Sequence, residues 1–401
     1  ENAALTDISA VLENMSGDEV EEDWVFLVDW YAKSKHPPPS GYLAWKGRLY
    51  GELHPDFSGL FAEPATAEFQ LGEVVWGGVA KDGIPSLDYL EQVPISEVRG
   101  YTPKDAVFGV SINGEHKAYP LRVMDWHEMA NDVVGGVPIA LSYCTLCGSA
   151  IVYRTDHPVQ DEPLVFGSSG LLYRSNKLMF DRKTNTVWNQ LTGRPVMGPL
   201  VGKVDQLEVF PVVITTKEAW TAQHPDSTIL PIDTGFFRDY SSGAAYGEYF
   251  ARDTVLFPVG EIDDRLSAKE QVYALEIEGA TKAYPIKTFA QEPIINDEID
   301  GTAVVLVAAS SEVNVHGYSY QLEYITYSVG GEIRAFERGD QTFSLSADGL
   351  IVDETGAVWD ISEEGLLNPN GEMLDRLGGH VSFWFGWQSF FPETAVYGSG
   401  E

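Results

Sequence analysis

The sequence predicts a mainly β protein of the α+β type, built from two tandem-duplicated, antiparallel β-rich lobes with short helices. Three observations lead to this fold class. Short alternating strands are bounded by turn residues, few segments show the 3.6-residue period of a long helix, and one block of sequence is repeated. The chain has 401 residues, which is enough for two domains that each bury a core.

The repeat is the strongest of these observations. KDAVFGVSINGEHKAYP, from Lys104, aligns without a gap with KEQVYALEIEGATKAYP, from Lys269. Farther along, LMFDRKTNTVW (178–188) resembles LIVDETGAVW (350–359), and both copies close with a tryptophan-bearing turn. Matched blocks in the same order indicate a duplication of one module.

Each copy opens with an alternating strand, a glycine turn and a second strand that ends in Tyr-Pro. A short helix or loop follows, which in the first copy carries MDWHEMAND, and the next strand is VPIALSYC or AVVLVAAS. We therefore predict a first repeat lobe over 71–230, a linker over 231–268 and a second, degenerate lobe over 269–401.

The N-terminal segment has a different pattern. Residues 4–34 are predicted to be helical in two pieces that break at Ser16-Gly17, and HPPPSG (36–41) ends the second piece because proline lacks the amide donor. We expect 42–75 to be mixed in structure, and 1–70 to form a partly helical arm through which copies of the chain can self-associate.

The charge balance excludes some partners. The chain has 26 basic and 60 acidic residues, a net charge of −34, so nucleic acid and anionic membranes are unfavourable partners. No apolar run approaches the roughly 18 residues that a membrane span needs. The start ENAALTDIS fits a processed N-terminus from which a signal has been removed.

The two cysteines of the chain form a CxxC motif, Cys144 and Cys147. The duplication provides a comparison for them, because scaffold residues persist in both copies whereas residues for chemistry need persist in only one. At the matching positions of the second copy, His127 becomes Glu292, Cys144 becomes Ala309 and Cys147 falls opposite Glu312. The three residues that can bind a soft metal disappear together.

Two thiolates at CxxC spacing and one imidazole can chelate a transition metal, and copper or zinc suits this set. We therefore predict a metal site at His127, Cys144 and Cys147, and leave open whether the protein is an enzyme acting on a small molecule. Residues that can line a pocket beside it are Glu128, Tyr173, Asn176 and Asp181.

Other interpretations of the same residues stay open. The CxxC can be the redox pair of a thiol–disulfide oxidoreductase, or two buried thiols that only fill space. The chain can also be a non-catalytic surface or assembly protein that makes its contacts through its acidic exterior and N-terminal arm.

Two long strings, YPLRVMDWHEMANDVVGGVPIALSYCTLCGSAIVY (119–153) and FGSSGLLYRSNKLMFDRKTNTVWNQLTGRPVMGPLVG (166–202), resemble the prokaryotic family named domain of unknown function 3179. The resemblance covers roughly residues 75–400. It implies an exported protein, located in the periplasm, on the cell surface or outside the cell. Because many members replace the second cysteine, often with threonine, it also points to Cys144 with His127 as the essential pair.

Overall fold

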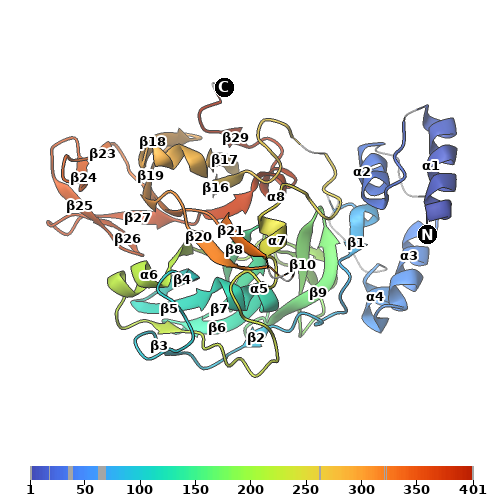
Figure 1. Cartoon of the computed structure of the whole chain (residues 1–401), viewed down its shortest axis with the longest axis horizontal. Helices are drawn as coiled ribbons and strands as arrows, with labels where there is room; N and C mark the ends of the chain where they lie inside the picture. Colours follow the sequence, from blue (N-terminus) through green and yellow to red (C-terminus); the bar gives the residue numbers. More distant parts are fainter. Residues whose placement is uncertain are drawn as a thin grey trace.

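The computed structural model describes residues 2–17, 19–34, 39–61, 69–261, 263–319, 321 and 323–399. Strands dominate, and in these residues they form six sheets with short helices around them (Figure 1). The mainly β fold class predicted from the sequence is confirmed.

The first half of the body contains three five-stranded sheets. Their orders are β1-β9-β10-β11-β12, β13-β8-β7-β6-β2 and β14-β4-β5-β15-β3. The strands are β1 (Val74–Trp76), β2 (Leu87–Asp88), β3 (Val93–Pro94), β4 (Ala106–Ile112), β5 (Glu115–Pro120), β6 (Met129–Val134), β7 (Val137–Cys144), β8 (Ser149–Arg154), β9 (Phe166–Tyr173), β10 (Asn176–Asp181), β11 (Val187–Asn189), β12 (Pro195–Met197), β13 (Val209–Phe210), β14 (Val213–Thr216) and β15 (Thr228–Ile229).

The second half has a four-stranded sheet, β28-β16-β17-β29, an eight-stranded sheet, β18-β19-β22-β27-β26-β25-β24-β23, and the pair β20-β21. The strands are β16 (Gln271–Ile277), β17 (Ala280–Pro285), β18 (Ile294–Ile299), β19 (Thr302–Ser310), β20 (Asn314–Tyr318), β21 (Tyr324–Ser328), β22 (Glu332–Glu337), β23 (Phe343–Leu345), β24 (Ile351–Asp353), β25 (Val358–Ile361), β26 (Gly365–Leu367), β27 (Met373–Leu377), β28 (His380–Phe383) and β29 (Ala395–Val396).

The helices are short, and the first four lie together at one end of the molecule (Figure 1). They are α1 (Asn2–Ser16), α2 (Trp24–Ser34), α3 (Tyr42–Gly51), α4 (Pro55–Leu60), α5 (Leu121–His127), α6 (Lys217–Gln223), α7 (Gly247–Phe250) and α8 (Trp384–Gln388), with 3₁₀ turns η1 (Leu71–Glu73) and η2 (Ile286–Ala290). No helix in the described ranges is long and apolar enough to cross a membrane.

The N-terminal segment is more helical than the sequence predicts. The break after Ser16 is present, but the region expected to be mixed forms α3 and α4. Helix α4 is supported by its N-cap His54, whose ring nitrogen accepts the backbone N–H of Asp56 at 3.3 Å. The start of the proline run, residues 36–38, lies outside the described residues.

Tight turns fix the register of the hairpins. Asn113 and Gly114 join β4 to β5 with φ of 50° and 77°, which is the left-handed pair that a two-residue hairpin turn needs. In the second half Glu278 and Gly279 join β16 to β17 with φ of 51° and 89°. Asparagine and glycine adopt these angles at low cost, whereas Glu278 is strained there.

Several contacts recur in the two halves. Tyr119 donates to Asp132 at 2.8 Å, and Tyr284 donates to Asp297 at 2.8 Å. Asn131 bonds both backbone groups of Phe166, and Asn296 bonds both backbone groups of Phe343. Two copies of one module would share such contacts, although the duplication itself stays a prediction from the sequence.

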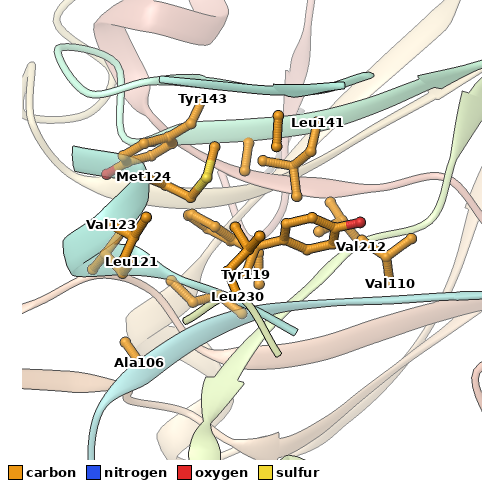
Figure 2. Packing of buried hydrophobic residues seen from close by; sticks show 14 of the residues in the cluster. Ala106, Val110, Tyr119, Leu121, Val123, Met124, Leu141, Tyr143, Val212 and Leu230 are labelled. Carbon is orange, nitrogen blue, oxygen red and sulfur yellow. The ribbon is translucent and has the colours of Figure 1, made fainter. Parts of the chain in front are cut away.

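The largest hydrophobic cluster lies beneath α5 and between β4–β5 and β6–β8 (Figure 2). Val123 and Met124 of α5 are fully buried there, with Tyr143 beside them. Val315 and Val329 from the second half belong to the same cluster. The two halves of the chain therefore share one apolar core, which includes residues of α5 and β7.

Candidate functional site

The two cysteines lie at the tip of one hairpin. Cys144 ends β7, Cys147 follows in the turn, and β8 begins at Ser149, which pairs with Cys144. Gly148 makes the turn with φ of 60°, an angle that favours glycine. Both thiols are free, and the exposed fractions of Cys144 and Cys147 are 1% and 0%.

A second turn brings polar groups onto the sulfur atoms. The Ser175 carbonyl oxygen lies 3.9 Å from Cys144 Sγ and 3.6 Å from Cys147 Sγ. Arg174 and Ser175 join β9 to β10 with φ of 50° and 59°, a conformation that costs non-glycine residues energy and is typical of functional sites. Asn176 then places its Nδ2 at 3.4 Å from Cys147 Sγ.

The two thiols differ in acidity. Burial by itself raises the pKa of Cys144, but hydrogen bonds from the Cys147 thiol and from the backbone N–H groups of Lys177 and Cys147 outweigh it, so this pKa is lowered. Burial, the hydrogen bond to Cys144 and the charge of Cys144 raise the pKa of Cys147 well above its usual value. Cys144 is therefore the more acidic of the two thiols, and Cys147 is the hydrogen-bond donor of the pair.

A buried ion pair adjoins Cys144. Lys177 Nζ donates to the Glu128 backbone oxygen at 2.7 Å and lies 3.4 Å from the Glu128 carboxylate. That carboxylate also accepts from Thr145 at 3.1 Å and from Tyr246 at 3.5 Å. Burial lowers the pKa of Lys177, while Glu128 and Cys144 oppose this shift, so the cation is held by these two negative neighbours.

Asp125 is an unusual member of this region. Its exposed fraction is 5%, and within the described part of the chain its carboxyl makes no hydrogen bond or ion pair. Burial, followed by the charge of Glu128, raises the pKa of Asp125 well above its ordinary value. Burial next to a second acid favours the protonated form of a carboxyl, and groups with such shifted pKa values concentrate at functional sites.

Some buried atoms beside the cysteines lack partners. Gln190 Oε1 accepts a hydrogen bond from Asn176 Nδ2 at 2.8 Å, but neither Asn176 Oδ1 nor Ser142 Oγ has a hydrogen-bond partner among the described residues. Ser142 and Cys144 are two residues apart on β7 and so share a face. Unsatisfied buried polar atoms call for a bound water, ion or ligand.

His127, which the sequence groups with the cysteines, has both ring nitrogens in other contacts. Nδ1 lies 2.7 Å from the Pro85 oxygen and Nε2 lies 2.6 Å from the Tyr240 hydroxyl. Because a carbonyl only accepts, Nδ1 donates and the Nε2 lone pair receives the Tyr240 O–H. Burial lowers the pKa of His127, which keeps the ring neutral.

The other predicted site residues divide into two groups. Glu128 and Asn176 lie beside the cysteines, as described above. Tyr173 packs on Phe69 with ring centroids 4.4 Å apart, and Asp181 accepts from Thr184 at 2.6 Å and from the Trp188 indole at 3.2 Å. In the described ranges no group of three or more His, Cys, Asp or Glu is placed to hold a metal ion.

The comparisons with known proteins add one finding. Residues 81–394 match the model of the family described as protein of unknown function (DUF3179). The chain belongs to the DUF3179 family. This confirms the resemblance, and the match covers both cysteines and both halves of the body. Neither the search of curated proteins nor the search of solved structures found a match.

The sequence did not reveal every residue of this candidate site in the DUF3179 chain. Ser175, Lys177 and Gln190 were absent from the prediction, and each touches a cysteine or a neighbour of one. The one sequence signal for these residues is the string YRSNK (173–177), which includes the predicted Asn176. This string is far from the CxxC along the chain, so the sequence does not show that Ser175 contacts Cys147.

The hydrogen bond from Cys147 gives the first testable prediction. Cys147→Ala removes the donor, so we expect the pKa of Cys144 to rise. Cys147→Ser retains an O–H donor and is expected to shift it much less. The ultraviolet absorbance of the thiolate, followed against pH, reports this without requiring access to the buried sulfur. Equal pKa values in the two variants would contradict the assigned hydrogen bond.

Proposed function

We propose that the protein binds one copper(I) ion between Cys144 and Cys147, and that this dithiol is its functional centre. The observation that supports the proposal is the pairing of Cys144, the more acidic thiol, with the Cys147 thiol, both of them buried. Thiolates are the soft ligands that copper(I) prefers.

The exchange conserves the charge on the two sulfurs and the cation that they hold. Copper(I) would replace the Cys147 proton: the ion forms one bond to each sulfur, the Cys147 S–H bond breaks, and one proton leaves. The two sulfurs and the bound cation carry a total charge of −1 before and after. Lys177 stays beside Cys144 as the compensating cation.

The donor set favours copper(I) over zinc. Zinc in proteins takes four ligands or keeps one of four open, whereas copper(I) is stable with two thiolates. Ligation by His127 would require its Nε2 to give up the Tyr240 hydroxyl, 2.6 Å away. The proposal therefore rests on the two sulfurs alone. The Asn176 amide nitrogen lies 3.4 Å from Cys147 Sγ as a neutral neighbour, and His127 is left in its contacts at the end of α5.

The test is a copper(I) titration without oxygen, in competition with a colour-forming copper(I) chelator. We expect one ion per wild-type chain, with one proton released, and a loss of affinity of about 100-fold or more in Cys144→Ser. His127→Ala is the matched variant and should keep most of the affinity. Wild-type protein that takes up no copper(I), or Cys144→Ser that binds as tightly, would refute the proposal.

A thiol–disulfide oxidoreductase is the second candidate, and the unequal acidity of the two thiols favours it. The Cys144 thiolate would attack one sulfur of a substrate disulfide and release a thiolate. Cys147 would then lose its proton and attack Cys144, which releases the second substrate thiol and leaves a Cys144–Cys147 disulfide. The chain is oxidised by two electrons and the substrate disulfide is reduced.

The two candidates separate in Cys147→Ser. An oxidoreductase would accumulate a mixed disulfide at Cys144 when a small disulfide is added, and intact mass would show the adduct. The Cys144→Ser variant is the control and should remain unmodified. In the copper case no adduct forms while the wild-type chain still binds the ion.

Export, which the family resemblance implies, is part of the proposal and is tested by cell fractionation.

A further inference from the structure

A buried charge cluster lies where the two halves of the body meet, away from the cysteines. The second half contributes Arg334 and Arg376 with Glu332 and Glu363, whose side chains are at most 5% exposed. The first half reaches the cluster through Thr215, which donates to Glu332 at 2.5 Å, and through Gln223 and His224.

The two arginines are used differently. Arg334 donates through all three of its nitrogens, to Glu363 at 3.0 and 2.5 Å, to Glu332 at 2.9 Å and to Gln223 at 3.3 Å. Arg376 uses Nη1 alone, which contacts the Glu363 carboxylate and its backbone oxygen. Its Nε and Nη2 are buried and have no hydrogen-bond partner in the part of the chain that the structure describes.

These two free nitrogens form one edge of the guanidinium plane. The Nε–H and Nη2–H bonds on that edge run side by side, which is the fork that binds two oxygens of a carboxylate or another oxyanion. The side chain of Arg376 is 3% exposed, so bulk water cannot solvate the fork. A buried charged donor without a partner costs more than a neutral one.

The two guanidinium groups of the cluster face two carboxylates, Glu332 and Glu363. Glu363 is shared, with Oε1 on Arg334 and Oε2 on Arg376, so one carboxylate faces two guanidinium groups. Burial, followed by the charge of Arg334, lowers the pKa of Arg376 to about 9. Tyr273 interacts with Arg376 electrostatically, and its hydroxyl also lacks a hydrogen-bond partner among the described residues.

We propose that the Nε–Nη2 edge of Arg376, together with the Tyr273 hydroxyl, binds a small oxyanion such as a carboxylate or nitrate at the junction of the two lobes. The fork supplies two parallel donors and the phenol supplies a third. The anion would accept the two N–H groups of Arg376 that have no partner among the described residues, and it would tie β27 to β16. The site is independent of the cysteines.

The test is thermal unfolding after refolding in formate, in nitrate or in chloride at equal ionic strength, since refolding gives each anion access to the buried fork. We expect a saturable rise of the midpoint with formate or nitrate. Tyr273→Phe should weaken the apparent affinity about tenfold, and Arg376→Gln should abolish the response. Tyr324→Phe, an exposed tyrosine, is the control and should respond as the wild type does.

Two results would overturn the proposal. One is a wild-type midpoint that does not depend saturably on either oxyanion. The other is a Tyr273→Phe response equal to that of the wild type, which would indicate a general salt effect. Tyr273→Phe removes one hydroxyl only, so it decides the question even where Arg376→Gln does not fold.

Discussion

Replacement of Arg334 by methionine is expected to lower the free energy of unfolding by about 3–5 kcal/mol. The guanidinium is fully buried and holds Glu332, Glu363 and Gln223 across the lobe junction. Without it, Glu332 keeps only neutral donors, Thr215 and Gln223, inside a dry interface. A buried carboxylate that loses its cation pays the desolvation cost in full.

Urea unfolding of the variant and the wild type measures this effect. Arg252→Met is the matched control, because Arg252 is largely exposed and its nearest acid, Glu248, is 3.6 Å away. A surface pair of this kind contributes about 0–1 kcal/mol. If Arg334→Met were no more destabilised than Arg252→Met, the charge cluster would not hold the lobes together.

Replacement of Asp125 by asparagine is expected to remove a large pH dependence of stability. The folded pKa of Asp125 is well above its ordinary value of 3.8, so the folded state binds the proton more tightly than the unfolded state. The contribution of protonated Asp125 to the free energy of unfolding is fully present below the pKa of the unfolded state. It is lost as the pH rises through the pKa of the folded state. Wild-type stability then falls by about 1.4 kcal/mol per pH unit within that window.

The measurement compares the free energy of unfolding at about pH 5 and about pH 8. From about pH 5 to about pH 8 the wild type should lose free energy of unfolding and Asp125→Asn should not. We expect the difference between the two proteins to change by more than about 1 kcal/mol in favour of the variant. Asp348→Asn alters an exposed aspartate and should follow the wild type. Parallel curves for Asp125→Asn and the wild type would show that Asp125 does not carry a proton into the folded state.

Much of the fold could be predicted because its signals are local. The Asn113-Gly114 turn and the alternation of the flanking strands fix the first hairpin within a few residues. The persistence of Asn131-Asp132 in both copies marked them as scaffold, and Asn131 does tie β6 to Phe166. Helices α3 and α4 were not predicted, because their apolar residues gave no clear helical period.

The candidate site was partly predictable for the same reason. Cysteines at CxxC spacing on a strand end must lie close together, and they do. The third residue, His127, was grouped with the cysteines because the second copy lacks it. That comparison does not predict where the His127 side chain points. On α5 the ring turns to Pro85 and Tyr240, partners that are distant along the chain.

The sequence by itself therefore determined the β-rich class, the family, the hairpins and the adjacency of Cys144 and Cys147, since each depends on neighbouring residues or on a repeated string. Tertiary structure alone decided which groups surround the sulfurs. Ser175, Asn176 and Lys177 reach them because the strained turn between β9 and β10 folds onto the CxxC hairpin. Tertiary structure also buries Asp125 and leaves one edge of Arg376 without a hydrogen-bond partner among the described residues. Burial and pairing depend on how distant parts of the chain pack together, and no local sequence pattern predicts this.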